Sequence, residues 1–326
     1  MAKRTPPQAR DTNGHAATKS LAIPSDRVTA PLDEPERLPV LKTYKLYIGG
    51  KFPRTESGRF DVICSAKGQP IANICRASKK DFRDSVVAAR AAQGGWAKRS
   101  AYNRAQILYR IAEMLEGRTT QFIEELLAVG GAASAALSPA QAKREVQSTV
   151  DRFVYYAGWC DKYSQVFSSV NPVASSHFNF SLHEPTGLVA IVAPDATPLL
   201  ALATLAAASI AGGNSVIILA SETNPLPSIT FSEVLATSDL PGGVVNVLTG
   251  QRAELVEHFS SHMDVNAVIY AAADRELLKK IQTLAANNVK RVIVPKIADY
   301  FSEKAESPYL ILDMQEVKTT WHPVGT

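Results

Sequence analysis

Residues 187–219 read GLVAIVAPDATPLLALATLAAASIAGGNSVIIL, and this stretch decides the fold. Its first part, 188–193, is an apolar run without polar alternation, which is typical of a strand buried on both faces. The small-residue segment 199–210 predicts a helix that ends at Gly212, because glycine is favoured just after the last turn of a helix. A second apolar run, 215–219, predicts another strand. This order of strand, helix and strand predicts a parallel βαβ unit.

The same alternation continues toward the C-terminus. Three further apolar strands are expected, separated by segments with helical patterning; the strands are 244–248, 265–270 and 289–294, and the helices are 227–235, 253–259 and 274–286. Strands that are connected through helices lie in one parallel sheet with helices on both faces. The sequence therefore predicts an α/β fold, a Rossmann-like doubly wound parallel sheet over residues 187–295.

Three other regions surround the predicted sheet domain. Residues 1–40 are rich in Pro, Ser, Thr and charge and predict a disordered tail, with a partner-binding or encapsulation peptide as the alternative. Residues 41–186 carry a hairpin, then helices, and then an extended strand near 178–183. Residues 296–326 hold a short connection and a last alternating stretch, 317–321, which we expect to end the chain as an isolated strand.

The composition is that of an ordinary globular protein. Hydrophobic residues make up 46% and charged residues 20%, and the formal net charge of +4 includes no long basic run. Neither nucleic-acid nor membrane-surface binding is therefore indicated. Cys64, Cys75 and Cys160 are widely spaced and the histidines lack metal-ligand spacing, so no disulfide framework or metal site is predicted. We expect a cytoplasmic protein, because neither a secretory signal nor a bilayer-spanning run is evident.

Several segments, taken together, resemble the aldehyde dehydrogenase superfamily. They are YIGGK (47–51), YYAGWCDK (155–162), EPTG (184–187), GNSV (213–216), GVVNVLTG (243–250) and EVKTTW (316–321). They occur in the family's order, and the similarity covers nearly everything from about residue 40 to 295. The chain is most similar to the second, non-catalytic module of the two-module, type-16 aldehyde dehydrogenases. The resemblance implies a Rossmann-like sheet of the aldehyde dehydrogenase type, with N-terminal helices and protruding oligomerisation strands.

The catalytic domain of that family would lie between Val294 and Leu312. Only residues 295–311 separate the two positions, which is too short for any domain. The family's nucleophilic cysteine is lost with that domain, and none of the three cysteines matches its position. The sequence also places no histidine, lysine or helix N-terminus to lower a thiol pKa. The resemblance therefore implies a pseudoenzyme without catalytic residues of its own.

The oxyanion site of the family is also altered. Its Pro-Trp-Asn-Phe-Pro segment corresponds to PDATP at 194–198. The family's asparagine amide donates to the developing oxyanion, whereas Ala196 has no donor. We expect Asp195, beside that position, to add repulsion. The Glu-Leu-Gly-Gly segment that supplies the family's general base is replaced by residues around Pro295 and Lys296.

The resemblance implies three vestigial cofactor-binding residues, Ser221, Glu222 and Gly250. Leu219 replaces the lysine that helps to hold the adenosine ribose in the family, while Ser221 and Glu222 match. Glu222 could accept hydrogen bonds from ribose hydroxyls. The alternative is that its carboxylate compensates the dipole of the helix that begins near Pro225.

The pyrophosphate site of the family is a Gly-Ser pair at a helix N-terminus, where free N–H groups attract phosphate. The matching positions are Ala272 and Ala273, followed by Asp274. We expect Asp274 to cap the helix and take up its N–H groups. Any NAD binding is therefore expected to be weak.

Our leading hypothesis is a structural or regulatory subunit that assembles with itself or with a full-length aldehyde dehydrogenase. The strands near 178–183 and 317–321 would pair with a neighbouring polypeptide, because an unpaired strand edge favours such addition. The alternative is that these two strands pair with each other in a self-dimer. Two other functions stay open: an NAD(P)-dependent aldehyde oxidoreductase that receives a thiol from a partner, and a nucleotide-binding module that uses the crevice near Glu222 and Gly250.

Overall fold

The computed structural model describes residues 40–129 and 137–325. The predicted tail therefore lies outside the described residues, except for Val40. The predicted hairpin turns at Gly49 and Gly50, whose φ angles of 62° and 79° suit glycine. Ile48 and Lys51 exchange backbone hydrogen bonds of 2.9 Å and 3.0 Å across this turn, as the predicted hairpin requires.

A five-stranded parallel sheet forms the centre of the described residues, in the order β10-β9-β6-β7-β8. Its strands are β6 (Leu188–Val192), β7 (Ser215–Leu219), β8 (Val245–Leu248), β9 (Ala267–Tyr270) and β10 (Arg291–Ile293). The chain runs from β6 outward to β8 and then returns to β9 on the other side of β6. This arrangement confirms the predicted doubly wound α/β fold.

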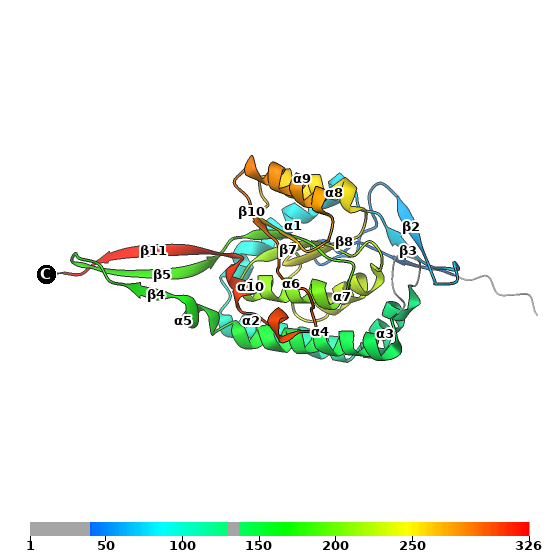
Figure 1. Ribbon diagram of the computed structural model, residues 1–326, viewed down its shortest axis with the longest axis horizontal. Helices are drawn as coiled ribbons and strands as arrows, with labels where there is room; N and C mark the ends of the chain where they lie inside the picture. Colours follow the sequence, from blue (N-terminus) through cyan, green and yellow to red (C-terminus); the bar gives the residue numbers. More distant parts are fainter. Residues whose placement is uncertain (1–39, 130–136, 326) are drawn as a thin grey trace, which may run out of the picture. The chain divides into compact units, whose positions relative to one another are not determined.

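Helices cover both faces of this sheet (Figure 1). Alternate strand residues face opposite layers: Val189 and Ile191 pack in one apolar cluster, and Leu188 and Ala190 in the other. All of β6 and β7 is buried, which explains why their sequences are continuously apolar. The helices that follow the strands are α6 (Leu200–Ala211), α7 (Leu226–Ala236), α8 (Arg252–Ser261) and α9 (Arg275–Ala286).

The N-terminal region supplies a small sheet and further covering helices. The sheet has the order β1-β3-β2 and consists of β1 (Lys42–Tyr44), β2 (Phe60–Cys64) and β3 (Pro70–Cys75). The helices are α1 (Lys79–Ala97), α2 (Ala101–Glu116), α3 (Thr119–Ala128), α4 (Pro139–Trp159) and α5 (Tyr163–Phe167). Ser78 and Ser138 each form a capping box at the start of α1 and α4, and these bonds fix where both helices begin.

A third sheet corrects one prediction. The stretch predicted to be an isolated strand is β11 (Gln315–Pro323), and it pairs antiparallel with β5 (His177–Pro185) along its full length. The short strand β4 (Ser169–Asn171) pairs with the other side of β5. Figure 1 shows the three strands side by side, projecting from the covering helices. The prediction was wrong because the pairing joins segments far apart in sequence, which strand patterning cannot detect.

The last strand of the central sheet is shorter than predicted. It begins at Arg291, because Val289 has a φ of 53° and turns the chain after α9. Between β10 and β11 lie only a connection, a 3₁₀ turn at Glu303–Ala305 and the short helix α10 (Tyr309–Leu312).

Candidate functional site

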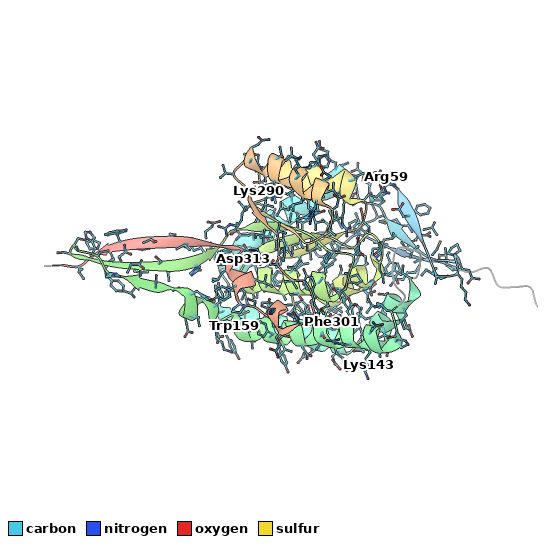
Figure 2. The ribbon with its side chains drawn as sticks, viewed as in Figure 1. Arg59, Lys143, Trp159, Lys290, Phe301 and Asp313 are labelled. Atoms are coloured by element: carbon cyan, nitrogen blue, oxygen red, sulfur yellow. The ribbon has the colours of Figure 1, made fainter. Side chains whose placement is uncertain are left out.

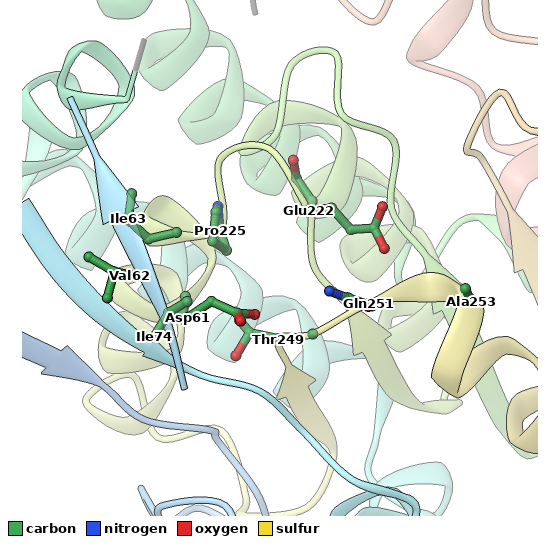
Figure 3. Close-up of a pocket in the computed structure, with 11 residues that line it drawn as sticks. Asp61, Val62, Ile63, Ile74, Glu222, Pro225, Thr249, Gln251 and Ala253 are labelled. Atoms are coloured by element: carbon green, nitrogen blue, oxygen red, sulfur yellow. The ribbon is translucent and has the colours of Figure 1, made fainter. Parts of the chain in front are cut away.

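A pocket of about 550 Å³ lies beside the loops that follow β7 and β8. The β2–β3 hairpin forms its other wall (Figure 3). The three predicted cofactor-binding residues, Ser221, Glu222 and Gly250, all line this pocket; the other lining residues are Asp61, Val62, Ile63, Ile74, Pro225, Thr249, Gln251 and Ala253. Ligands of open α/β sheets bind at the carboxyl ends of the strands, so this pocket is the candidate site.

Gly250 is required by local packing. Its φ of +148° belongs to glycine, and a Cβ there would lie 3.2 Å from the backbone nitrogen of Ala77. The neighbouring Thr249 accepts a 2.8 Å hydrogen bond from the same nitrogen. Its hydroxyl also donates to the carbonyl of Cys75 at 2.6 Å. The loop after β8 is therefore held tightly against the end of β3.

Asp195 is the centre of a polar network beside this pocket. Its carboxylate accepts two hydrogen bonds from the guanidinium of Arg252, at 2.6 Å and 2.8 Å. It also accepts from the Ser221 hydroxyl at 2.8 Å and from the Glu222 backbone at 3.0 Å. Arg252 further donates to the carbonyl of Ala193 at 2.8 Å. The network joins the loops that follow β6 and β7 to the first turn of α8.

The electrostatics of this network differ from the prediction for Asp195. Burial by itself would raise the pKa of Asp195, but the hydrogen bonds and charge of Arg252 lower it below its ordinary value. The expected repulsion from Asp195 is therefore reduced, because the two-point contact with Arg252 offsets its charge. Sequence analysis missed Arg252, whose side chain is only 8% exposed. The sequence feature that could have pointed to Arg252 is its place in the first turn of a helix, where a positive charge is unfavourable without a carboxylate partner.

Glu222 also forms bonds to other residues of the protein. Its carboxylate accepts a hydrogen bond from the backbone N–H of Arg252 and lies 3.5 Å from the Arg252 guanidinium. A carboxylate at this place compensates the dipole at the start of a helix. The helix concerned is α8, and the suggestion that it is the helix beginning near Pro225 is wrong.

Asp274 caps α9, as the sequence predicts. Its Oδ1 atom accepts hydrogen bonds from the backbone N–H groups of Glu276 at 2.8 Å and Leu277 at 3.1 Å. These are the donors that a phosphate would use at a helix N-terminus. An anion at this place would have to displace a carboxylate that is already bonded.

The start of α6 carries an internal carboxylate that sequence analysis missed. Glu145 of α4 is buried, and its Oε1 atom accepts from the backbone N–H groups of Leu199 at 2.9 Å and Leu200 at 3.2 Å. Burial raises the pKa of Glu145, while the two backbone bonds lower it less. A glutamate on the apolar stripe of a helix is unusual, and this feature of the sequence could have indicated that Glu145 has a buried partner.

The connection after β10 covers the same end of α6. Tyr300 packs with Leu200 in a small apolar cluster, and its carbonyl accepts a 2.9 Å hydrogen bond from the buried Arg152. Phe301, labelled in Figure 2, lies 4.4 Å from the guanidinium of Arg144 on α4. The short connection thus packs against the first turn of α6 and against α4.

The cysteines form no reactive centre in the described part of the chain. Cys75 and Cys160 are buried and Cys64 is half-buried, and none lines the pocket beside β7 and β8. Burial raises the pKa of the Cys160 thiol to about 12, and its sulfur contacts the carbonyl of Tyr156 at 3.4 Å. A thiol with a raised pKa is a poor nucleophile. Within the described residues, no group of three or more His, Cys, Asp or Glu side chains could hold a metal ion.

Comparison with known proteins identifies the family. The sequence model of the aldehyde dehydrogenase family matches residues 52–295. This chain belongs to the aldehyde dehydrogenase family. The match ends two residues after β10 and does not include β11.

Relatives of this aldehyde dehydrogenase homologue are longer than the chain itself. The cytosolic 10-formyltetrahydrofolate dehydrogenase of Mus musculus is 30% identical over 261 residues, which cover 79% of this chain and 28% of that protein. The same enzyme of Pongo abelii is 32% identical, with 76% of this chain and 28% of that protein covered. The chain therefore spans less than a third of the length of these relatives.

Solved structures show the same fold. The NAD+ complex of the aldehyde dehydrogenase from Bacillus cereus superposes with a TM-score of 0.72 at 24% identity, covering 78% of this chain and 50% of that one. The betaine aldehyde dehydrogenase of Staphylococcus aureus has the same score at 22% identity, with 77% and 50% covered. The structural similarity thus covers half of each of these two chains.

The residues of this homologue do not fit NAD in the family's manner. Ser221 and Glu222 are bonded to Asp195 and Arg252, and Leu219 has no polar atom that could donate to a ribose hydroxyl. The N–H groups at the start of α9 are bonded to Asp274.

No helix in the described residues is both long and apolar enough to cross a membrane.

Proposed function

We propose that this aldehyde dehydrogenase homologue is a non-catalytic subunit with a structural or regulatory role. The observation that carries the proposal is the connection after β10. A short segment with Tyr300 and Phe301 packs on α6 and α4, and the chain between β10 and β11 is too short to hold a catalytic domain. Ser221, Glu222 and Gly250 belong to this proposal as vestigial cofactor residues. We also propose a cytoplasmic location, which its cytosolic relatives support.

The assembly surface in this proposal is the β11-β5-β4 sheet. Val170, Phe178 and Leu182 lie in β4 and β5 and are 67%, 46% and 42% exposed. Val170 stands opposite Phe180 in the register, so these side chains share one face with the alternating residues of β5. Several exposed apolar side chains on one face of a sheet favour a protein partner.

The free edge of β11 supports the same proposal. β11 pairs with β5 on one side, and no strand in the described part of the chain pairs with its other side. A long strand edge offers unpaired N–H and C=O groups to another strand. We propose that a second copy of this chain, or a full-length aldehyde dehydrogenase, adds a strand here.

The test is the mass of the purified full chain in solution, alone and mixed with a full-length aldehyde dehydrogenase from the same source. Size-exclusion chromatography with light scattering and native mass spectrometry measure it. We expect an oligomer or a mixed complex, and we expect Phe178→Lys with Leu182→Lys to give a monomer. Val87→Lys is the matched control, because Val87 is 65% exposed on α1, outside the β11-β5-β4 sheet. A chain that stays monomeric in every mixture would overturn the proposal.

A further inference from the structure

A second pocket lies between the first turn of α1 and the last turn of α8. Its volume is about 410 Å³, and it shares no lining residue with the pocket beside β7 and β8. Lys79, Lys80, Phe82 and Arg83 line it from α1, and His258, Ser261 and His262 from the end of α8. Nothing in the candidate site or in the assembly surface uses these residues.

The charges of this basic pocket are unbalanced. Its lining holds three cations and two imidazoles but no carboxylate. Lys80 is paired with Glu56, and Arg83 with Asp84. Lys79 has no ion pair to any described residue, so its charge is available to an anion.

The core holds the ring of His262 in place. The ring of His262 meets the edge of Phe82, with 5.8 Å between ring centroids, and Phe82 stacks on Phe259 at 4.6 Å. His262 Nδ1 accepts a 3.2 Å hydrogen bond from the backbone N–H of Asp264, so its Nε2 atom carries the proton. His258 is half-buried in the last turn of α8.

The surroundings of the imidazoles discourage a positive charge unless an anion is present. Burial lowers the pKa of His258, and Lys79 lowers it further. Burial also lowers the pKa of His262. The charged groups around them are Lys79 of α1, Glu257 of α8, Lys280 of α9, and Asp264 and Lys290 of the adjoining loops. Glu257 is paired with Lys280, and the Nζ of Lys290, labelled in Figure 2, donates to the carbonyls of Phe259 and His262.

We propose that this basic pocket binds a small phosphate monoester. A phosphate group has three oxygens free to accept hydrogen bonds from Lys79, His258 and His262, and bonds between charged groups are the stronger ones. The pocket has room for a phosphate together with a small organic substituent, which would contact the aliphatic stems of Lys79 and Arg83. An anion beside His258 stabilises the protonated form of that ring, whereas His262, whose Nδ1 accepts from the Asp264 N–H, donates through Nε2 as a neutral ring.

The experiment is isothermal titration calorimetry of the full chain at constant ionic strength, with inorganic phosphate and with phenyl phosphate. We expect saturable binding of one equivalent at about pH 7, where both probes still carry dianion. Tighter binding of phenyl phosphate than of phosphate assigns an organic monoester. Equal affinities assign the free anion at the same pocket. Absence of binding by both probes would overturn the proposal.

Variants decide whether binding occurs at this pocket. Lys79→Gln combined with His258→Gln is expected to weaken binding about tenfold or more, because two charge-assisted bonds are lost. Ser261→Phe, which fills the pocket and leaves its charges in place, is expected to do the same. Lys143→Gln removes an equal charge from α4 (Figure 2) and is expected to change the affinity less than about twofold. If both pocket variants are folded by circular dichroism and bind as the wild type does, the assignment is wrong.

Discussion

Arg252 and Asp195 form a two-point ion pair, with Nη1 at 2.6 Å from Oδ2 and Nη2 at 2.8 Å from Oδ1. The pair joins the loop after β6 to the start of α8 across the carboxyl ends of the sheet. Ser221 and Glu222 donate to the same carboxylate. The residues that the sequence nominates for a cofactor therefore hold the protein together at that place.

Asp195→Ala should destabilise the protein. It leaves the guanidinium of Arg252, which is only 8% exposed, without its carboxylate. Because Asp195 itself is 36% exposed, solvent reduces the loss, and we expect the free energy of unfolding to fall by about 2 kcal/mol. Urea denaturation measures it. Asp84→Ala removes an exposed pair with Arg83 and should cost about 0.5 kcal/mol or less; equal losses in the two variants would contradict this role.

The contribution of Asp195 should depend on pH in the acid range. Its pKa in the folded protein lies below the ordinary value of 3.8, so the unfolded chain takes up the proton first as the pH falls. The stabilisation is therefore complete above about pH 5 and is lost as the pH falls through the folded pKa. Asp195→Asn cannot titrate, so the difference in unfolding free energy between wild type and variant should shrink from about pH 6 to about pH 3. A difference that stays constant over this range would refute the assignment.

Glu145 should stabilise α6 through its acceptor oxygen. Glu145→Ala leaves the buried N–H groups of Leu199 and Leu200 without a partner and should cost about 2–3 kcal/mol. Glu145→Gln keeps an oxygen that can accept, so it should cost less than half as much. Thermal and urea unfolding of the two variants check the order. If Gln is as damaging as Ala, the negative charge and not the acceptor is what α6 requires.

The thiols should differ in reactivity. The buried Cys160, whose pKa is raised to about 12, and the buried Cys75 should react slowly with a disulfide reagent at neutral pH. The half-buried Cys64 should react first. We expect one fast thiol in the native protein and three in denaturant. Replacing Cys64 with Ser supplies the control, since it should abolish the fast phase; rapid reaction of Cys160 would show that its site opens.

The chain alone should not oxidise aldehydes. Short aldehydes with NAD or NADP should give no NADH or NADPH, because no thiol lines the pocket beside β7 and β8. Ala196→Asn restores an amide near the family's oxyanion position but should not restore turnover, since an oxyanion donor does not replace a nucleophile. Absorbance at 340 nm measures the product. Turnover by the purified chain that ends when one of its cysteines is replaced would overturn the non-catalytic proposal.

The sequence by itself determined the sheet, the order of its elements and the cap on α9. Continuous apolar runs such as 188–193, punctuated by Gly212 and by Asp274, carry this information locally, because strand burial and helix capping act over a few neighbouring residues. The sequence also indicated where the family's catalytic domain is lacking, because the number of residues between Val294 and Leu312 can be counted directly.

Only the tertiary structure decided what the polar residues do. Asp195 meets Arg252 across 57 positions and Glu145 meets Leu199 across 54, and β11 meets β5 at a greater separation still. Hydrogen bonds and ion pairs depend on distance and direction in space, and the chain pattern fixes neither for residues on different elements. For that reason Ser221 and Glu222 could be placed at one end of the sheet from the sequence, while their use as internal bonds became visible only in the folded protein.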